Sequence, residues 1–327
     1  MRFGAHVTAA KGYRQMARYA RQTGCECVQI FAKSPRQWQA KPLSDGRLKE
    51  MRDLIDQGAV CPVNTHTSYL LNLSTDNDEL REKSIAALAD ELVRAAQLGC
   101  TAVNTHVGTA SAAAPADAAA ADGEPLSPES ARAAERAGQA AVRAWELAER
   151  QLADLGEEAR LTTPVLLFED TAGAGTTFGS SVSELAAAIA ASGLGADRLG
   201  ICIDTCHAWA AGYPLDGAEG WDALLGRIDG LMGIDRLQLL HLNDCLHGCG
   251  QHKDRHAWIG RGRISAAGFA ALVADPRLAR LDAVLEMPGQ LPEKDEVNLG
   301  VLKALRDGLG PKEAVAAGAA LHPGATQ

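Results

Sequence analysis

The stretch Pro164–Phe168, with the sequence PVLLF, is a short apolar run that is followed at once by Glu169. Seven further runs of this kind occur along the chain, and stretches with apolar residues at helical spacing separate them. An alternation of strands and helices that repeats eight times favours a parallel (β/α)8 barrel over a doubly wound sheet. The eight predicted strands are Phe3–Val7, Cys27–Phe31, Ala59–Thr65, Ala102–Thr105, Pro164–Phe168, Leu199–Ile203, Leu237–Leu240 and Ala283–Leu285.

Length and composition agree with one large α/β domain. The chain has 327 residues, and a barrel of this type needs about 250. Aromatic residues make up only 4% of the chain, so the core must be aliphatic. No G-x-G-x-x-G sequence follows the first strand, which counts against a dinucleotide-binding fold. The predicted helices include Tyr13–Thr23, Glu79–Leu98, Ala131–Leu155, Val182–Ala191 and Ser265–Val273.

Two segments fit the alternation poorly. The segment Ala110–Pro128 is rich in Ala, Asp, Ser and Pro and has no apolar period, which predicts a flexible surface insertion. The segment from about Gly310 to Gln327 is rich in Gly, Ala and Pro, and we expect a loosely ordered tail there. Because no interdomain linker is visible, we expect a single barrel domain over residues 1–309.

The formal net charge is −9, from 41 acidic and 32 basic residues. A module of this size that binds the nucleic-acid backbone is normally basic, so the charge argues against the simplest nucleic-acid function. No apolar stretch approaches the roughly 20 residues of a membrane-spanning helix, and no export signal precedes the first strand. The eight cysteines show no paired C-x-x-C spacing, so we expect a cytoplasmic protein with reduced thiols.

A potential metal ligand follows each predicted strand from the third to the eighth. The carboxyl ends of all strands in a (β/α)8 barrel open on one face, which is where active sites lie. A single His or carboxylate at a strand end is usually a helix cap or a loop residue, but six at equivalent positions would converge on one pocket. The six residues are His66, His106, Glu169, Asp204, His241 and Glu286.

Three further candidates lie close to these in the sequence. His207 follows Asp204 by three residues, and Asp254 alternates with His256, so these two point the same way in extended backbone. The carboxylates would repel one another in a partly buried mouth unless cations neutralised them. A set of nine mixed N and O ligands suits two or three ions of Zn²⁺ or Mn²⁺ rather than Mg²⁺ or Ca²⁺. Such clusters are typical of phosphoester hydrolysis.

These motifs resemble those of endonuclease IV, the zinc-dependent apurinic/apyrimidinic endonuclease family. The most specific are D-T-C-H-A-x-A-A-G-Y at residues 204–213 and D-R-H at residues 254–256. The other matching stretches are Gly4–Val7, Arg36–Trp38, His66–Leu73, Glu169–Gly173, His241–Asp244, Ile259–Gly260 and Leu285–Glu286. The resemblance runs from the first predicted strand to the last and covers nearly the whole chain.

The resemblance implies a TIM barrel with three zinc ions at the strand ends, and Mn²⁺ is an alternative metal at one or more positions. One ion would be held by His66, His106 and Glu169. Glu169 would bridge to a second ion, which Asp204, His241 and Glu286 would complete. The third would be held by His207, Asp254 and His256. Glu169 would also be catalytic, by orienting the attacking hydroxide.

The implied reaction is hydrolysis of the phosphodiester 5′ to an abasic site in duplex DNA. It would leave a 3′-hydroxyl, and removal of 3′-blocking groups would accompany it. Arg36, Tyr69 and Leu70 match positions that insert into DNA and fill the gap left by an extruded nucleotide, which a missing base makes easier to extrude. Arg255 would contact a phosphate. The resemblance also implies a monomer that associates with the nucleoid when it acts, without a nucleotide cofactor or a membrane.

Bound zinc would reverse the argument from net charge. Three Zn²⁺ ions would add six positive charges to the formal −9, giving −3. The four acidic ligands would go from −4 to +2 with these ions, and a phosphate could dock there. We therefore expect binding to undamaged DNA to be weak and to fade with salt, rather than to be absent.

The chain departs from the family pattern at several positions. Where the family usually has H-P-G-S, residues 106–109 read H-V-G-T, and the Ala-rich segment follows at once. Met287 stands where Thr is common, and Arg261 stands where many members have an acid. Four potential soft ligands, which we interpret as loop residues rather than as a further metal site, are Cys245, His247, Cys249 and His252.

Two alternatives come from other functional classes. A sugar isomerase or epimerase of the related xylose-isomerase-like barrels would need Glu169, Asp204, His241 and Glu286 for a single metal ion. It would leave the five other candidates without a role. A non-catalytic damage-binding protein would need a broken ligand set, and no ligand is missing.

Overall fold

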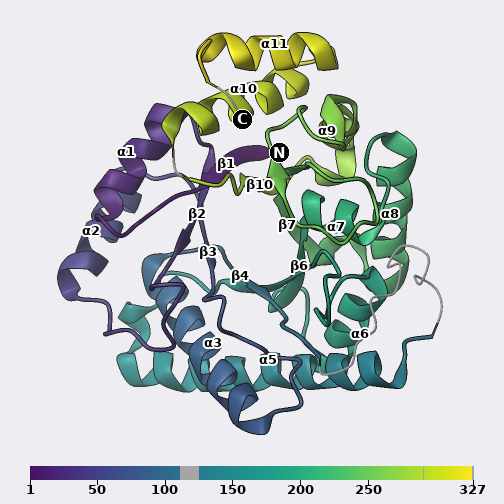
Figure 1. Ribbon diagram of the computed structural model, residues 1–327. Helices are drawn as coiled ribbons and strands as arrows, with labels where there is room; N and C mark the ends of the chain where they lie inside the picture. The colour runs from purple at the N-terminus through teal and green to yellow at the C-terminus, as the bar shows by residue number, and fades with distance from the viewer. Residues whose placement is uncertain (111–124, 290, 326–327) are drawn as a thin grey trace.

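The computed structural model describes residues 1–110, 125–289 and 291–325. Eight parallel strands close into a barrel with helices around it, and Figure 1 looks along this barrel. The strand order is β1-β10-β7-β6-β5-β4-β3-β2, so barrel strands that follow one another in the chain are neighbours in space. The predicted (β/α)8 TIM barrel is therefore confirmed.

The strands lie close to their predicted positions. The barrel strands are β1 (Arg2–His6), β2 (Cys27–Phe31), β3 (Val63–His66), β4 (Ala102–His106), β5 (Val165–Glu169), β6 (Leu199–Asp204), β7 (Leu237–His241) and β10 (Asp282–Leu285). Outside the barrel, β8 (Asp244–Cys245) and β9 (His256–Ala257) form a short antiparallel pair. The prediction was wrong at residues 59–62, since β3 pairs with β2 only from Val63 onward and Pro62 has no N–H to donate.

The helices include all five that the sequence predicted. They are α1 (Tyr13–Thr23), α2 (Asp45–Asp56), α3 (Asp78–Leu98), α5 (Pro128–Leu155), α6 (Val182–Ser192), α7 (Thr205–Ala211), α8 (Ala218–Met232), α9 (Ser265–Ala274), α10 (Pro292–Arg306) and α11 (Pro311–Leu321). Short 3-10 turns occupy Glu157–Ala159, Ile234–Arg236 and Pro276–Leu278. Among the described residues, no helix is both long enough and apolar enough to cross a membrane.

The long helices begin and end at residues that satisfy their terminal backbone groups. The side chain of Asn77 accepts a hydrogen bond of 2.9 Å from the backbone N–H of Leu80 and starts α3. Gly99, with φ of 71°, ends the same helix in the left-handed conformation. Ser127 caps α5 in the same way as Asn77 caps α3. Each such cap contributes about 1 kcal/mol to helix stability.

Small residues let the outer helices approach one another closely. A methyl group on Gly138 of α5 would lie 2.5 Å from the carbonyl oxygen of Ala188 in α6, so the two helices could not pack as they do. Most of the buried residues of α5 are alanines. The low aromatic content of the chain therefore goes with a core built by close helix approach, as well as by Leu, Ile and Val.

The expectation of a loosely ordered tail was wrong for residues 311–321, which form α11. This helix packs on α10, and both lie outside the barrel, at the top of Figure 1. Ala314 is buried, and a methyl group on Gly318 would lie 2.5 Å from a methyl carbon of Val301. The Ala and Gly content that suggested disorder is what this close helix contact requires.

The predicted insertion at about residues 110–128 falls mainly on residues 111–124, which lie outside the described part of the chain. At its edges, Ala110 is buried and Pro128 begins α5. An isolated bridge joins Thr109 to Thr177 at the start of this segment.

Candidate metal centre

The candidate site lies at the carboxyl ends of the barrel strands. The register of β4 with β5 places His106 beside Glu169, and that of β6 with β7 places Asp204 beside His241. The strand ladders extend through these residues, one position further than the sequence predicted, because their backbones still pair with the neighbouring strand. Candidate ligands from strands far apart in the sequence therefore become direct neighbours.

Strand periodicity explains why these side chains point into the barrel. Side chains two residues apart in a strand lie on the same face. A separate apolar cluster contains residues that precede four of the candidate ligands by two positions, namely Leu167, Cys202, Leu239 and Val284. An apolar layer thus fills the barrel, and the polar layer of the site lies directly above it.

Two groups of predicted ligands have their candidate ligand atoms within 4.8 Å of one another, and Glu169 belongs to both. The first group is His66, His106 and Glu169, and the second is Glu169, Asp204, His241 and Glu286. Glu169 and Asp204 are completely buried. Because the two groups share Glu169, their six residues form a continuous set across the barrel mouth.

The remaining predicted ligands meet around Asp254. His207 Nε2 lies 3.4 Å from Asp254 Oδ2, and His256 Nε2 lies 3.1 Å from Asp254 Oδ1. Asp204 lies close enough to complete a group with His207 and His256, and Cys206 completes one with Asp254 and His256. The structure thus brings all nine predicted ligands to one face and adds the thiol of Cys206, which the sequence analysis did not single out.

Hydrogen bonds to carbonyl oxygens fix the protonation of two of the imidazoles. His66 Nδ1 lies 2.8 Å from the carbonyl oxygen of Thr67, and His207 Nδ1 lies 3.1 Å from that of Asp170. A carbonyl oxygen only accepts, so Nδ1 carries the proton in both rings. The other ring nitrogen, Nε2, then faces Glu169 in His66 and Asp254 in His207.

Two further imidazoles are oriented in the same manner. His256 Nδ1 donates to the carbonyl oxygen of Glu286 at 2.8 Å, and His241 Nε2 donates to Gln29 Oε1 at 3.0 Å. The other nitrogen of each ring, Nε2 of His256 and Nδ1 of His241, thereby faces into the site. Metal-binding histidines in proteins have this arrangement, in which an outer oxygen holds the ring nitrogen opposite the metal.

Burial and charge act in opposite directions on the ionisable groups of the site. Burial alone would raise the pKa of Glu169, but the nearby His106 and His241 hold it well below its usual range. Burial would lower the pKa of His256, whereas its contact with Asp254 raises it to about 9. The site thus keeps Glu169 ionised despite its burial, which is the state that binds cations.

The donor set fits divalent transition-metal ions. The Nε2 atom of His256 is buried and faces the carboxylate oxygens of Asp254 at 3.1 Å and Asp204 at 3.7 Å, which could hold an ion together with this ring. The donors around it are imidazole nitrogens and carboxylate oxygens, the mixed set that suits Zn²⁺ or Mn²⁺.

The sequence analysis missed several neutral residues that hold the acidic ligands. Asn104 donates to Glu169 Oε2 at 2.6 Å, and Asn243 donates to Asp204 Oδ2 at the same distance. Gln29 donates to the carboxylate that follows the last strand, as well as accepting from His241. A signal existed for Gln29, which is a polar residue inside an otherwise apolar strand, and for Asn104, which is a polar residue two positions before the predicted ligand His106.

The residues predicted to contact DNA lie at the rim of the site. Tyr69 is 64% exposed, and Tyr69 and Leu70 line a pocket of about 460 Å³ together with His106 and His207. Leu70 is half-buried and lies at this pocket, so it is not an ordinary core residue. Arg36 is exposed in the loop that follows β2.

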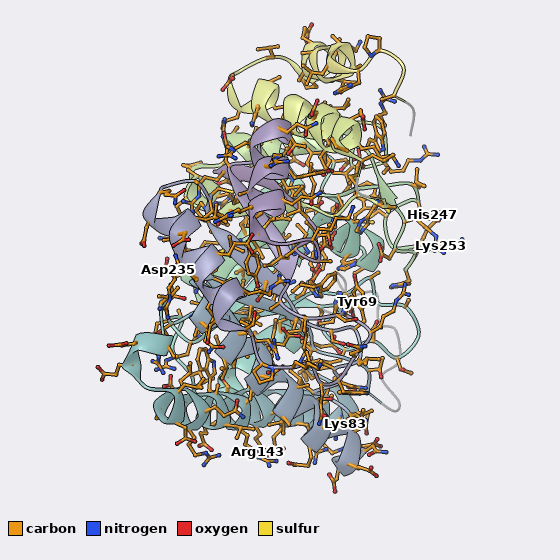
Figure 2. The ribbon with its side chains drawn as sticks, turned by 90° about the vertical axis from the view of Figure 1, so that its left-hand side faces the viewer. Tyr69, Lys83, Arg143, Asp235, His247 and Lys253 are labelled. Carbon is orange, nitrogen blue, oxygen red and sulfur yellow. The ribbon has the colours of Figure 1, made fainter. Side chains whose placement is uncertain are left out.

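Arg255 is also exposed, and it donates to the carbonyl oxygen of the preceding Asp254 at 3.0 Å. Figure 2 shows Tyr69, His247 and Lys253 on one side of the molecule and Asp235, which precedes β7, on the opposite side. The rim residues therefore share the face on which the strands end.

The four potential soft ligands do not form a metal group of their own within the described chain. His252 is bonded to the carbonyl oxygen of Ala172 at 3.0 Å. The carbonyl oxygen of His247 accepts a hydrogen bond of 2.9 Å from the indole of Trp209. These contacts attach the loop between β8 and β9 to its neighbours. The interpretation as loop residues thus agrees with the structure for His247, Cys249 and His252, whereas Cys245 belongs to β8.

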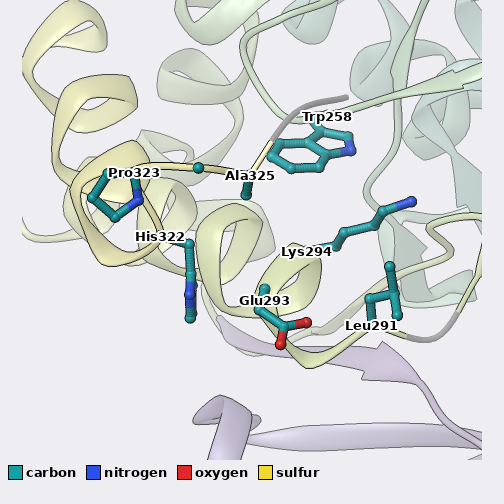
Figure 3. Close-up of a pocket in the computed structure, with 8 residues that line it drawn as sticks. Trp258, Leu291, Glu293, Lys294, His322, Pro323 and Ala325 are labelled. Atoms are coloured by element: carbon teal, nitrogen blue, oxygen red, sulfur yellow. The ribbon is translucent and has the colours of Figure 1, made fainter.

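A different pocket, of about 410 Å³, lies between Trp258, α10 and the segment after α11 (Figure 3). Its walls include Lys294 and His322. It contains none of the predicted metal ligands or DNA-contact residues, so it is separate from the candidate site.

Comparison with known proteins first shows the class of barrel protein to which the chain belongs. The family described as xylose isomerase-like TIM barrel matches residues 17–306. Solved structures with low identity agree on the fold, such as a D-tagatose 3-epimerase-like protein with a TM-score of 0.65 and 19% identity, covering 97% of this chain and 98% of the other. The fold and the strand-end site thus define a xylose isomerase-like barrel.

Relatives with higher sequence identity show which family within this class the chain belongs to. A "Probable endonuclease 4" of Chloroflexus aurantiacus is 38% identical over 94% of this chain and 99% of its own. One of Oleidesulfovibrio alaskensis is 38% identical over 92% of this chain and 94% of its own. The crystal structure of endonuclease IV from Thermus thermophilus superposes with a TM-score of 0.75 at 36% identity, covering 94% of this chain and 100% of the other. The chain belongs to the endonuclease 4 family.

Proposed function

We propose that this protein is a DNA repair endonuclease that hydrolyses the phosphodiester 5′ to abasic sites in duplex DNA, leaves a 3′-hydroxyl and removes 3′-blocking groups. The names of its relatives support nuclease chemistry. The proposal includes three zinc ions per chain, with Mn²⁺ as an alternative. It also places a monomeric protein in the cytoplasm, on nucleoid DNA.

The observation that carries the proposal is the number of donors directed into one pocket. Four imidazoles are each held by an outer oxygen so that the other ring nitrogen faces the site. Four carboxylates and the imidazole of His106 complete the set. A single ion binds about four such donors, so nine donors support several ions.

We assign the ions as the contacts group the side chains. His66, His106 and Glu169 would hold the first, Asp204, His241 and Glu286 with Glu169 the second, and His207, Asp254 and His256 the third. When bound, these ions would activate water as a nucleophile at neutral pH and neutralise the negative charge of the leaving 3′ oxygen.

Glu169 is the residue to which we assign the central role. Its two carboxylate oxygens face different histidines, with Oε2 at 3.1 Å from His66 Nε2 and Oε1 at 3.0 Å from His241 Nδ1. Asn104 fixes the carboxylate plane through its bond to Oε2. This arrangement suits a carboxylate that bridges two ions and accepts a hydrogen bond from the attacking water.

The rim residues would present the lesion to the site. A phosphodiester in a straight duplex cannot reach the barrel mouth, so the abasic nucleotide must leave the stack. Tyr69 and Leu70, at the edge of the 460 Å³ pocket, would fill the vacated space with ring and aliphatic surface. Arg36 would insert beside them, and Arg255 would contact a phosphate.

A sugar isomerase or epimerase with one metal ion is the second candidate. It is favoured by the compact group Glu169, Asp204, His241 and Glu286, which is complete by itself. Solved epimerases share the fold at 14–19% identity, which supports the architecture alone. This function would leave the oriented rings of His66, His207 and His256 without a purpose.

A duplex with one tetrahydrofuran analogue of an abasic site tests the proposal. The analogue cannot undergo β-elimination, so a cut must be hydrolytic. We expect the zinc-loaded protein to incise on the 5′ side and leave a 3′-hydroxyl that a polymerase extends. The absence of incision, combined with one tightly bound ion per chain, would favour the isomerase instead.

A further inference from the structure

A second set of charges, of which all but Asp90 are buried, lies outside the candidate metal centre. It consists of Lys33, in the loop after β2, and of Asp90, Glu91 and Arg94, which lie within about one turn of each other on α3. The side chains of Lys33 and Glu91 are each 1% exposed, and that of Arg94 is 5% exposed. Ionic groups are rarely buried to this degree unless they are paired.

The lysine joins the helix to the loop. Lys33 Nζ lies 2.9 Å from Asp90 Oδ2 and 3.6 Å from Glu91 Oε1. It also donates to the carbonyl oxygens of Trp38, in the loop, and Ala87, in α3, at 3.3 Å each. One ammonium group thus connects two segments that are far apart in the sequence.

The arginine makes the same connection at the other end of the loop. Arg94 Nε donates to both carboxylate oxygens of Asp90, at 3.0 and 2.9 Å. Its Nη2 donates to the carbonyl oxygens of Ala40 and Lys41, at 3.2 and 2.8 Å. Asp90 therefore orients the two cations, and the cations bind three carbonyl groups of the loop.

This loop, residues 32–44, contains neither helix nor strand and carries Arg36 at its exposed part. The carbonyl oxygen of Pro35, beside Arg36, accepts hydrogen bonds from Ser68 Oγ at 2.7 Å and from the backbone N–H of Tyr69 at 3.2 Å. The ring of Trp38 lies 4.5 Å from the Nζ of Lys83, another residue of α3. These contacts connect the segment of Arg36 to the segment of Tyr69 and attach the loop of Arg36 to α3.

We propose that Lys33, Asp90, Glu91 and Arg94 are positioning residues that hold the loop of Arg36, and through Pro35 the segment of Tyr69 and Leu70, in the shape that enters a DNA duplex at a lesion. The inference rests on the proposed function. Its ligand is the distorted duplex around an abasic nucleotide, and its effect is on nucleotide extrusion rather than on hydrolysis.

The physical reason is the cost of ordering a loop during binding. Fixing the backbone of one flexible residue costs about 1–2 kcal/mol, and a loop already fixed in the free protein does not add this cost to binding. An apolar contact could hold α3 against the barrel equally well, but it could not satisfy the partly buried carbonyl groups of an irregular loop. Lys and Arg each supply several N–H donors, and their charge strengthens these bonds.

The test needs variants that do not leave a buried charge alone. Lys33→Met by itself would leave the buried Glu91 without its ion-pair partner, which is strongly destabilising. Lys33→Met combined with Glu91→Gln removes one charge of each sign. Arg94→Lys is the second variant, because it keeps the charge but cannot reach Asp90 and two loop carbonyls at once. The matched control is Lys303→Met, because Lys303 also donates to a carbonyl oxygen, that of Gly24, which ends α1 far from this loop.

Three measurements on the zinc-loaded full chain separate positioning from general damage. They are the steady-state constants on the tetrahydrofuran duplex, the fluorescence of 2-aminopurine placed next to the lesion, and hydrolysis of bis(p-nitrophenyl) phosphate, which needs no nucleotide extrusion. For both variants we expect KM to rise roughly ten- to a hundredfold and kcat to change by less than about threefold. The fluorescence rise on binding should shrink, while hydrolysis of the small diester and the behaviour of Lys303→Met should match the wild type.

Two results would overturn the inference. One is an unchanged KM and fluorescence signal in a folded variant. The other is an equal loss of both activities, which would place the damage in the metal centre. If the double variant does not fold, Arg94→Lys decides alone. Failure of the wild-type protein to incise the duplex would instead refute the proposed function, so the two failures are distinguishable.

Discussion

The candidate metal centre and the charged set on α3 are both buried, but they differ in how their charges balance. In the metal centre, the neighbours of Glu169 and Asp254 are histidines whose ring nitrogens are directed inward. On α3, Asp90 is shared by Lys33 and Arg94, which also bind the nearby loop carbonyls. The first set needs cations from outside, whereas the second formally balances itself with two charges of each sign.

This difference distinguishes a site that binds ligands from a set of charges that holds a loop in place. Burying ionic groups is costly, and the cost is offset either by a matched number of partners or by something that binds. Where each buried charge has a partner of opposite sign, as on α3, the charges fix the backbone in place. Where donors outnumber internal partners, as at the barrel mouth, the surplus indicates binding. The two buried glutamates, Glu169 and Glu91, therefore offer a direct comparison of the same substitution in the two settings.

The largest expected effect is that of Glu169→Gln. The amide keeps the shape of the side chain but loses the charge that, in our proposal, would bridge two ions, so kcat for incision should fall by more than about 10³-fold. Binding of the tetrahydrofuran duplex, measured by fluorescence anisotropy, should persist because the rim residues are untouched. The matched Glu91→Gln should retain kcat. Normal turnover by Glu169→Gln would refute the role assigned to this residue.

Removal of the metal ions should have the next largest effect. A ligand present at about a hundred times its dissociation constant stabilises the folded state by about 2.7 kcal/mol. We therefore expect chelation to lower the midpoint of thermal unfolding by roughly 5–10 °C and zinc to restore it. Elemental analysis should give three ions per chain. Chelation that removes the ions without shifting the midpoint would show that the inward-facing histidines do not depend on them.

The strand-end residues could be predicted from the sequence because two regularities combine there. A barrel places all strand ends on one face, and alternation within a strand directs every second side chain inward. His106, Glu169 and Asp204 follow from these two rules alone. The oriented ring of His256 could not be predicted in this way, because its partner is a backbone carbonyl oxygen of a distant strand end.

The support on α3 was not predictable because nothing local marks it. Glu91 and Arg94 lie in a helix whose sequence also carries many exposed charges, so a solvated face was the simpler interpretation. Their burial follows from the path of the loop after β2, which contains no regular structure. The helix α11 was missed for the opposite reason, since its small residues have a role only once α10 lies beside them.

The pH dependence of stability gives a further test of the comparison between the metal centre and the charges around Glu91. Burial is the main cause that raises the pKa of this carboxyl to about 7, with Lys33 opposing it. Because the pKa is raised in the folded state, the protonated carboxyl of Glu91 stabilises the fold. This contribution is full below about pH 4.5 and is lost as the pH rises through 7. The unfolding free energy of the wild type relative to Glu91→Gln should therefore fall by about 3 kcal/mol between pH 4.5 and 7. If urea unfolding gave the same difference in unfolding free energy between the wild type and Glu91→Gln at both pH values, this prediction would be wrong.

The smallest effect is expected where charges are paired but exposed. Arg143 of α5 and Glu82 of α3 form a bidentate ion pair, and their side chains are 52% and 51% exposed. Figure 2 shows Arg143 at the outer surface of the helix layer. Because water and salt screen such a pair, Arg143→Ala should change the unfolding free energy by less than about 1 kcal/mol and leave incision unchanged. A larger loss, measured by urea unfolding at two salt concentrations, would mean that the α3–α5 contact depends on charge. The close packing of small residues in α5 would then be insufficient to hold α3, and the attachment of the Arg36 loop would depend on this surface pair as well.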